Sequence, residues 1–146
     1  IRGRIALANS TRVYRRFREL FDGESFAALE RRGARVQRPL WASTGTKNAS
    51  DSDVMYIEEL IGPDTITTVP PATLDAFRDH GRVRLTLETE GEEGEAVLAT
   101  AATLGLDVHA ITEQLQTDGI KAFASSFDEL VATLGEKRRQ ILTTAG

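Results

Sequence analysis

The sequence contains no cysteine, four prolines and a single tryptophan. Without cysteine it can form no disulfide framework, no thiolate metal site and no cysteine nucleophile. No run of apolar residues approaches the roughly 18 that a membrane-spanning helix needs, and no segment resembles a secretory signal. Histidine is scarce too: His80 fits a cation at a helix C-terminus, and His109 has no partner at a metal-ligand spacing. These absences predict no metal site and no membrane contact, and they suit a reducing, cytoplasmic location.

What is present is typical of a soluble globular protein: 40% of the residues are hydrophobic, 27% are charged, and the net charge is −4. The mild acidity argues against a nucleic-acid surface, although the first third of the chain is locally basic. On a helix, such a run is typical of a solvated outer face rather than of a binding patch. We therefore expect no nucleic-acid partner. The arginines concerned are Arg2, Arg4, Arg12, Arg15, Arg16, Arg18, Arg31, Arg32, Arg35 and Arg38.

An apolar, strand-like segment from 36 to 42 leads into a polar loop, residues 43–48, that is rich in hydroxyl groups. The loop holds Ser43, Thr44 and Lys47 around Gly45. In α/β proteins, ligands bind at the carboxyl ends of strands, where loop amides, hydroxyls and a cation converge on an anion. These are the right groups for a phosphate. The same residue types also make ordinary loops, so loop capping without ligand contact remains the alternative.

Periodicity and turn signals predict an α/β order of elements in the first part of the chain. Val13, Phe17, Leu20 and Phe21 recur on one face of a helix, and the strand is expected to be regular only after Pro39. With short connections, the order helix–strand–helix–strand–helix implies parallel strands. The predicted segments are helices at 4–21 and 25–33, a strand at 36–42, a helix capped by Asp51 or Ser52 and ending at Gly62, a strand at 64–69 and a helix at 71–80.

The character of the sequence changes after Gly81. Residues 83–87 alternate like an edge strand or an extended connection, and the acidic run at 90–95 is interpreted as a solvated loop rather than a cation site. Helices are predicted at 96–104, at 108–115 after a cap by Asp107, and at 120–142 after Gly119. In the last of these, an inward stripe is expected, formed by Phe123, Phe127, Leu130 and Leu134.

Several long motifs in register resemble the bacterial transaldolase family, and the match extends from Gly3 to about Gly81. They are Arg-Pro-Leu-Trp-Ala-Ser-Thr-x-Thr-Lys-Asn at 38–48, Tyr-Ile-Glu-Glu-Leu-Ile-Gly-Pro-Asp-Thr at 56–65, Pro-Pro-Ala-Thr-Leu at 70–74, and Ala-Leu-Ala-Asn at 6–9 with Tyr14 and Phe17 after it. The resemblance implies the C-terminal part of a (β/α)8 TIM barrel. Such barrels need about 250 residues, and this chain of 146 begins without Met, so we expect a portion of a longer protein. Residues 1–81 would carry the last two β/α units, and residues 82–146 a helical extension that packs on the barrel.

The resemblance also implies a mechanism that uses no cofactor. A lysine amine forms a Schiff base with a ketose, the C–C bond breaks, and a dihydroxyacetone unit passes to an aldose phosphate. Such a lysine must be desolvated or lie near another cation. In the family it lies upstream of the region matched here, so we expect no catalytic residue in this chain. Lys121 and Lys137 lie outside the loop, and Lys47 is rejected as the Schiff-base residue.

The resemblance assigns the substrate phosphate to Ser43 as a hydroxyl donor and Lys47 as the cation, with Thr44 as a plausible second hydroxyl. The sequence departs from the family pattern at two places: Ala49-Ser50-Asp51 replaces Pro-Ala-Tyr, and Thr67 replaces an Asn. A carboxylate at Asp51 would oppose phosphate binding if it faced the site, whereas as a helix N-cap it would face the backbone. Trp41 is expected to be core packing with its N–H group satisfied rather than a wall of the sugar pocket.

The expected function is therefore that of a transaldolase segment in the pentose phosphate pathway, which supplies the phosphate-binding loop. Its partners would be sugar phosphates (fructose 6-phosphate, sedoheptulose 7-phosphate, erythrose 4-phosphate and glyceraldehyde 3-phosphate) and the remainder of the barrel. Without the Schiff-base lysine the isolated chain should be inactive. Two alternatives stay open: a non-catalytic α/β module that binds phosphate, and another Schiff-base aldolase-type barrel with a different donor.

Overall fold

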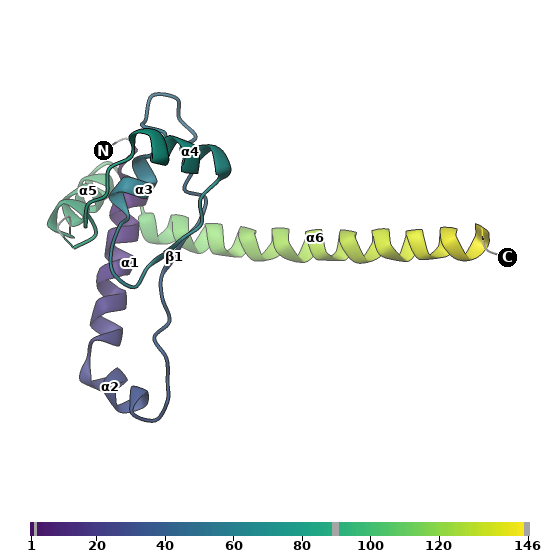
Figure 1. Cartoon of the computed structure of the whole chain (residues 1–146), viewed down its shortest axis with the longest axis horizontal. Helices are drawn as coiled ribbons and strands as arrows, with labels where there is room; N and C mark the ends of the chain where they lie inside the picture. Colours follow the sequence, from purple (N-terminus) through teal and green to yellow (C-terminus); the bar gives the residue numbers. More distant parts are fainter. Residues whose placement is uncertain (2, 89–90, 145–146) are drawn as a thin grey trace. The chain divides into compact units, whose positions relative to one another are not determined.

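A computed structural model describes residues 1, 3–88 and 91–144, which divide into two units, Ile1–Gly105 and Leu106–Gly146. The first unit holds five helices and two strands among its described residues, and the second is a single long helix (Figure 1). In chain order the elements are α1 (Ile5–Phe21), α2 (Glu24–Glu30), β1 (Leu40–Trp41), α3 (Met55–Glu59), β2 (Ile66–Thr67), α4 (Pro71–His80), α5 (Gly91–Thr103) and α6 (Val108–Thr144).

The two strands are parallel, with Leu40 opposite Ile66 and Trp41 opposite Thr67. The Ile66 N–H donates to the Pro39 carbonyl at 2.9 Å, so the proline accepts a ladder bond although it has none to donate. The regular strand therefore begins after Pro39, as predicted, but both strands are shorter than the predicted ranges. A parallel pair joined through helix α3 confirms the predicted α/β order and is consistent with part of a barrel.

Helix α1 supplies half of the apolar cluster at the centre of the first unit. The cluster consists of Leu7, Tyr14, Phe17, Trp41, Leu60 and Leu87. Phe17 belongs to the predicted inward face, but Val13 and Leu20 are 46% and 49% exposed, so that prediction is wrong for them. The buried face turns instead toward Leu7 and Ala8, because α5 packs against that side of the helix.

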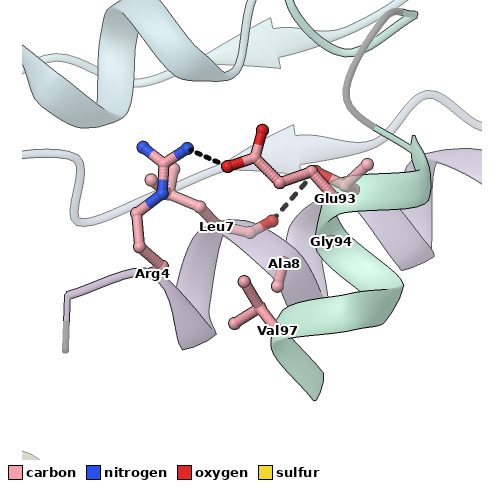
Figure 2. A pocket seen from close by; sticks show the side chains of 7 residues that line it. Arg4, Leu7, Ala8, Glu93, Gly94 and Val97 are labelled. Atoms are coloured by element: carbon pink, nitrogen blue, oxygen red, sulfur yellow. Dashed lines mark hydrogen bonds and ion pairs between the residues drawn. The ribbon is translucent and has the colours of Figure 1, made fainter. Parts of the chain in front are cut away.

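The approach of α5 to α1 depends on small residues. A Cβ added to Gly94 would lie 3.5 Å from the Ala8 Cα, so nothing larger than a methyl group fits between the helices. Figure 2 shows the small pocket beside this crossing, where Arg4 reaches Glu93 at 3.3 Å. Small side chains at a helix crossing allow the two backbones to come close.

Ion pairs with α1 explain why the acidic run does not form the predicted solvated loop. Residues 91–95 form the first turns of α5, and Glu90 lies outside the described residues. The Arg12 guanidinium donates to both oxygens of Glu95, at 3.1 and 2.8 Å, and Arg15 reaches the same carboxylate at 3.4 Å. Both arginines remain exposed, as predicted for a solvated outer face, and they also form ion pairs across two helices.

The second unit, helix α6, begins as predicted: the Ala110 N–H donates to the Asp107 carboxylate at 2.9 Å, which satisfies a free donor of the first turn. The predicted break at Gly119 is wrong, because α6 runs through it. A glycine in a helix interior costs only about 1 kcal/mol, which is less than ending one helix and nucleating another.

Helix α6 contains no buried residue, and its predicted stripe is exposed: Phe123, Phe127, Leu130 and Leu134 are 81%, 65%, 54% and 58% exposed. A stripe of this kind is the face that an amphipathic helix normally buries against a partner. Within the described parts of the chain, no helix combines the length and the apolar character that crossing a membrane requires.

Candidate functional site

A cavity of about 310 Å³ opens at the carboxyl end of β1, where the polar loop leaves the sheet. Ser43, Thr44 and Lys47, the three residues that the sequence singles out, all line it. Helices α1 and α3 close its other sides. The remaining lining residues are Ala6, Ser10, Trp41, Ala42, Gly45, Tyr56 and Leu60. The position agrees with the rule that ligands of parallel α/β sheets bind beyond the carboxyl ends of the strands.

Ser43 has a left-handed backbone, with φ of 57°. This conformation is uncommon for a residue with a Cβ. It persists only where the surrounding structure holds the backbone in place, and such positions cluster at functional loops. Its side chain is exposed, and so is that of Lys47. Within residues 1, 3–88 and 91–144, neither the Ser43 hydroxyl nor the Lys47 ammonium has a hydrogen-bond partner. Both groups are therefore available to a ligand in the cavity.

Thr44 is used differently, because its side chain is only 2% exposed and its hydroxyl donates to the Thr68 carbonyl at 2.7 Å. Thr68 in turn donates from its N–H to the Trp41 carbonyl at 2.9 Å. The single hydrogen of the Thr44 hydroxyl is thus engaged with the segment that follows β2. This bond connects the polar loop to the residue that follows β2, so the Thr44 hydroxyl stabilises the loop.

Hydrogen bonds within the chain also hold the segment between the polar loop and α3. The Thr46 hydroxyl donates to the Ser52 carbonyl at 2.8 Å, and the Asn48 amide donates to the Asp51 carboxylate at 3.3 Å. Neither Asp51 nor Ser52 occupies the N-cap of α3, which is Val54 and has no side-chain bond of its own. The Ser52 hydroxyl nevertheless accepts from the Val54 N–H at 3.4 Å, just before the helix begins. Asp51 does not line the cavity and lies beside Gly3. The Asp51 carboxylate is therefore not among the groups that line the cavity.

For Trp41, the prediction of core packing is confirmed, but the prediction of a satisfied indole N–H is wrong. It is 8% exposed and belongs to the apolar cluster, as expected for core packing. Its indole N–H, however, is buried without a hydrogen-bond partner in the part of the chain that the structure describes. An unpaired buried donor of this kind carries a desolvation cost of about 1–3 kcal/mol.

Thr73 lies close to Gly45, although the sequence did not indicate Thr73 as a site residue. A Cβ added to Gly45 would lie 3.3 Å from Pro70 Cγ, 3.5 Å from Thr73 Oγ1 and 3.7 Å from Lys47 Nζ. The first turn of α4 therefore lies directly behind the polar loop. The sequence does contain one indication of this position. Pro70-Pro71-Ala72-Thr73 begins a helix immediately after the second strand, which places Thr73 in the first turn of that helix.

His80, at the other end of α4, joins that helix to the segment after the polar loop. Its two ring nitrogens lie 3.0 Å from the Asp53 carboxylate and 3.1 Å from that of Asp79. Hydrogen bonds to Asp53 and then Asp79 raise the pKa of His80, and the bond to His80 lowers the pKa of Asp53. The prediction of a cation at a helix C-terminus fits this environment. Among the described residues, no three His, Asp or Glu side chains are grouped so that they could hold a metal ion.

A family model and several curated relatives match this chain. The family model described as transaldolase/fructose-6-phosphate aldolase matches residues 1–134. The chain belongs to this family. It is 44% identical over 134 residues to a transaldolase of Neisseria meningitidis and 45% identical over 135 residues to a transaldolase of Thiobacillus denitrificans. It is 43% identical over 135 residues to transaldolase 1 of Streptomyces coelicolor.

These matches cover 92% of this chain but only 38% of the Neisseria and Thiobacillus transaldolases, and 35% of the Streptomyces one. The chain therefore spans little more than a third of the length of the relatives that it matches. Membership in the transaldolase family implies a TIM-barrel fold, and two parallel strands with their helices are consistent with a part of one. Each of the three lysines of the chain, Lys47, Lys121 and Lys137, is exposed.

Proposed function

We propose that this chain is the phosphate-binding segment of a transaldolase, with Ser43 and Lys47 as the ligands of the substrate phosphate. One observation carries the proposal: an unpaired hydroxyl and an unpaired ammonium line one cavity at the carboxyl end of a parallel strand. A phosphate offers several acceptor oxygens, and charge-assisted hydrogen bonds to them are about twice as strong as neutral ones. Thr44 would contribute by fixing the loop to Thr68 rather than by donating to the phosphate.

The chemistry would come from elsewhere in the enzyme. In the proposed reaction a lysine amine outside this chain attacks the ketose carbonyl, and water leaves as the Schiff base forms. The C–C bond then breaks, and the remaining carbons leave as an aldose phosphate. The three-carbon unit stays on the lysine until it adds to the aldehyde of an aldose phosphate, and hydrolysis frees the product and the amine. Lys47 would hold the phosphate end of the sugar, so that the carbonyl is presented to that lysine in a fixed orientation. Sugar phosphates such as fructose 6-phosphate would be the substrates.

We also propose that residues 82–146 form a helical extension that packs on the barrel. The support is the apolar stripe of α6, formed by Phe123, Phe127, Leu130 and Leu134, which a single helix cannot bury by itself. The family match continues to residue 134, which lies within that stripe. Barrel segments that the relatives possess and this chain lacks would be the partner of the stripe.

A chimera tests the proposed function directly. Residues 1–134 of this chain would replace the matching segment of the Thiobacillus denitrificans transaldolase, and transfer from fructose 6-phosphate to erythrose 4-phosphate would be measured. We expect an active chimera, and we expect Lys47→Met to raise its KM for fructose 6-phosphate about tenfold or more, because a charge-assisted bond is lost. Lys121→Met, on exposed α6, is the matched control and should leave KM unchanged.

Borohydride trapping of the chimera with fructose 6-phosphate separates the roles of the lysines. The adduct should map to a lysine supplied by the Thiobacillus part, and the isolated 146-residue chain should show neither adduct nor turnover. A folded but inactive chimera, an adduct on Lys47, or a KM that is the same in Lys47→Met would contradict the proposal. If the chimera does not fold, an NMR titration of the 146-residue chain with inorganic phosphate gives the test, with shifts expected at the amides of 43–48.

A further inference from the structure

The N-terminus of helix α4 faces the polar loop with its donors unused. Helix α4 has ten residues, its N-cap is Pro70, and no side chain caps it or brings an acidic group into the first turn. For the residues that the structure describes, the N–H groups of Ala72 and Thr73 have no hydrogen-bond partner. Free first-turn N–H groups and the positive end of the helix dipole together favour an anion.

Thr73 provides a second and independent observation at the same place. Its side chain is 8% exposed, so it is more than nine-tenths buried. Its hydroxyl bonds to no other described residue, so its donor and acceptor sites are open to a ligand. It is aimed at the loop, since a Cβ on Gly45 would stand 3.5 Å from Thr73 Oγ1 and 3.7 Å from Lys47 Nζ. A hydroxyl and an ammonium thus converge on the side of Gly45 that carries no side chain.

We propose that Thr73 and the first-turn N–H groups of α4 bind the same phosphate as Lys47, so that α4 adds ligands to the site from beside Gly45. The inference rests on the proposed function and deepens it. Ser43 and Lys47 approach the anion from the loop after β1, whereas Thr73 approaches it from the helix after β2. Gly45 separates the two, and any side chain there would occupy the space between the ammonium and the hydroxyl.

The test is an amide NMR titration of the 146-residue chain with inorganic phosphate, with Thr73→Val as the main variant. Valine keeps the shape of threonine and removes only the hydroxyl group. We expect shifts at Ala72 and Thr73 together with those at Ser43 and Lys47, and a phosphate Kd about tenfold weaker in Thr73→Val. Thr73→Ser should restore the Kd, whereas Thr103→Val, at the exposed end of α5, should not change it. Gly45→Ala should also weaken binding, because its methyl group fills the gap.

The outcomes distinguish this inference from the function on which it rests. If Lys47→Met loses phosphate while Thr73→Val retains the wild-type Kd, the role of α4 is overturned and the proposed function stands. In the wild-type chain, phosphate-induced shifts at residues 43–48 without shifts at 72 and 73 would also overturn the role of α4. This result does not depend on whether Thr73→Val folds. If Lys47→Met binds phosphate as the wild type does, or the wild type binds none, both ideas fall together.

Discussion

At the scale of single residues, the candidate site depends on one strained backbone and on which hydroxyls already have partners. Ser43 keeps a φ of 57° although it carries a Cβ, and its hydroxyl is left open to the cavity. Thr44, the next residue, has the same functional group but gives its hydrogen to the Thr68 carbonyl. Two adjacent hydroxyls that look equivalent in the sequence therefore differ in their hydrogen bonding, because only Thr44 lies within reach of the Thr68 carbonyl.

The left-handed backbone of Ser43 makes its substitutions separable in stability and in binding. Ser43→Gly and Ser43→Ala both remove the hydroxyl, so both should weaken inorganic phosphate binding by the same factor. Glycine adopts a positive φ without steric cost, so Ser43→Gly should be about 1 kcal/mol more stable than Ser43→Ala. Urea unfolding and a phosphate titration on the two variants measure the two effects. An alanine variant that is the more stable of the pair would show that Ser43 is not held in this conformation.

At the scale of elements, the site is assembled by contacts that join segments distant in sequence. The Thr44 hydroxyl ties the polar loop to the end of β2, Gly45 lets that loop approach the start of α4, and His80 ties the end of α4 to Asp53. The loop and α4 are thus connected at both ends of the helix. A substitution of His80 should therefore destabilise the segment around Asp53, which follows the polar loop.

The pairing of His80 with Asp53 predicts a pH-dependent stability. The pKa of His80 is raised, so its contribution is complete below its ordinary pKa of about 6.5 and is lost as the pH rises through the raised value. The pKa of Asp53 is lowered, so its contribution holds above about pH 3.9 and is lost as the pH falls through the lowered value. Thermal unfolding of wild type and His80→Gln should therefore differ most at about pH 4–6.5.

The exposed His109, on α6, provides the matched control for that experiment. At about pH 5.5, where His80→Gln should lower Tm, His109→Gln should leave it unchanged, because His109 is exposed. A difference between wild type and His80→Gln that grows toward alkaline pH would contradict the assigned partners of His80. The side chains concerned are exposed, so added salt should also reduce the effect.

At the scale of the whole molecule, the exposed surface of α6 is best understood with the family match. A helix of 37 residues without a buried side chain has only the bonds within the helix to stabilise it, although most helices in proteins depend on a packed face. The matched relatives are more than twice as long as this chain. Under the proposed arrangement, the missing barrel segments would cover the stripe.

A comparison of one substitution in two contexts tests that arrangement. Phe127→Ala in the isolated chain should change the free energy of unfolding by no more than about 0.5 kcal/mol, because the side chain is 65% exposed. In the chimera with the Thiobacillus transaldolase, the same substitution should cost about 3–5 kcal/mol, as deletion of a buried ring does. Glu129→Ala, on another face of α6, should be neutral in both. Equal effects of Phe127→Ala in the two proteins would mean that the barrel does not cover the stripe.

The sequence alone determined the order of the elements up to residue 81, the family, and the loop that carries Ser43 and Lys47. These depend on local signals: periodicity, prolines and glycines at element ends, and motifs read in register. Tertiary structure decided which face of α1 is buried, because α5 covers Leu7 and Ala8 rather than Val13. It also turned the acidic run into a helix start, because Arg12 and Arg15 lie opposite Glu95.

Thr73 shows the same division at the candidate site. It lies 26 positions after Lys47 in the sequence, and no local pattern relates the two. Only the parallel pairing of β1 with β2 brings the polar loop and the start of α4 to one edge of the sheet. Whether a hydroxyl group is already paired depends on atoms that other elements supply. Local signals therefore fix where a loop or helix begins, whereas three-dimensional packing decides which of its polar groups are free to bind.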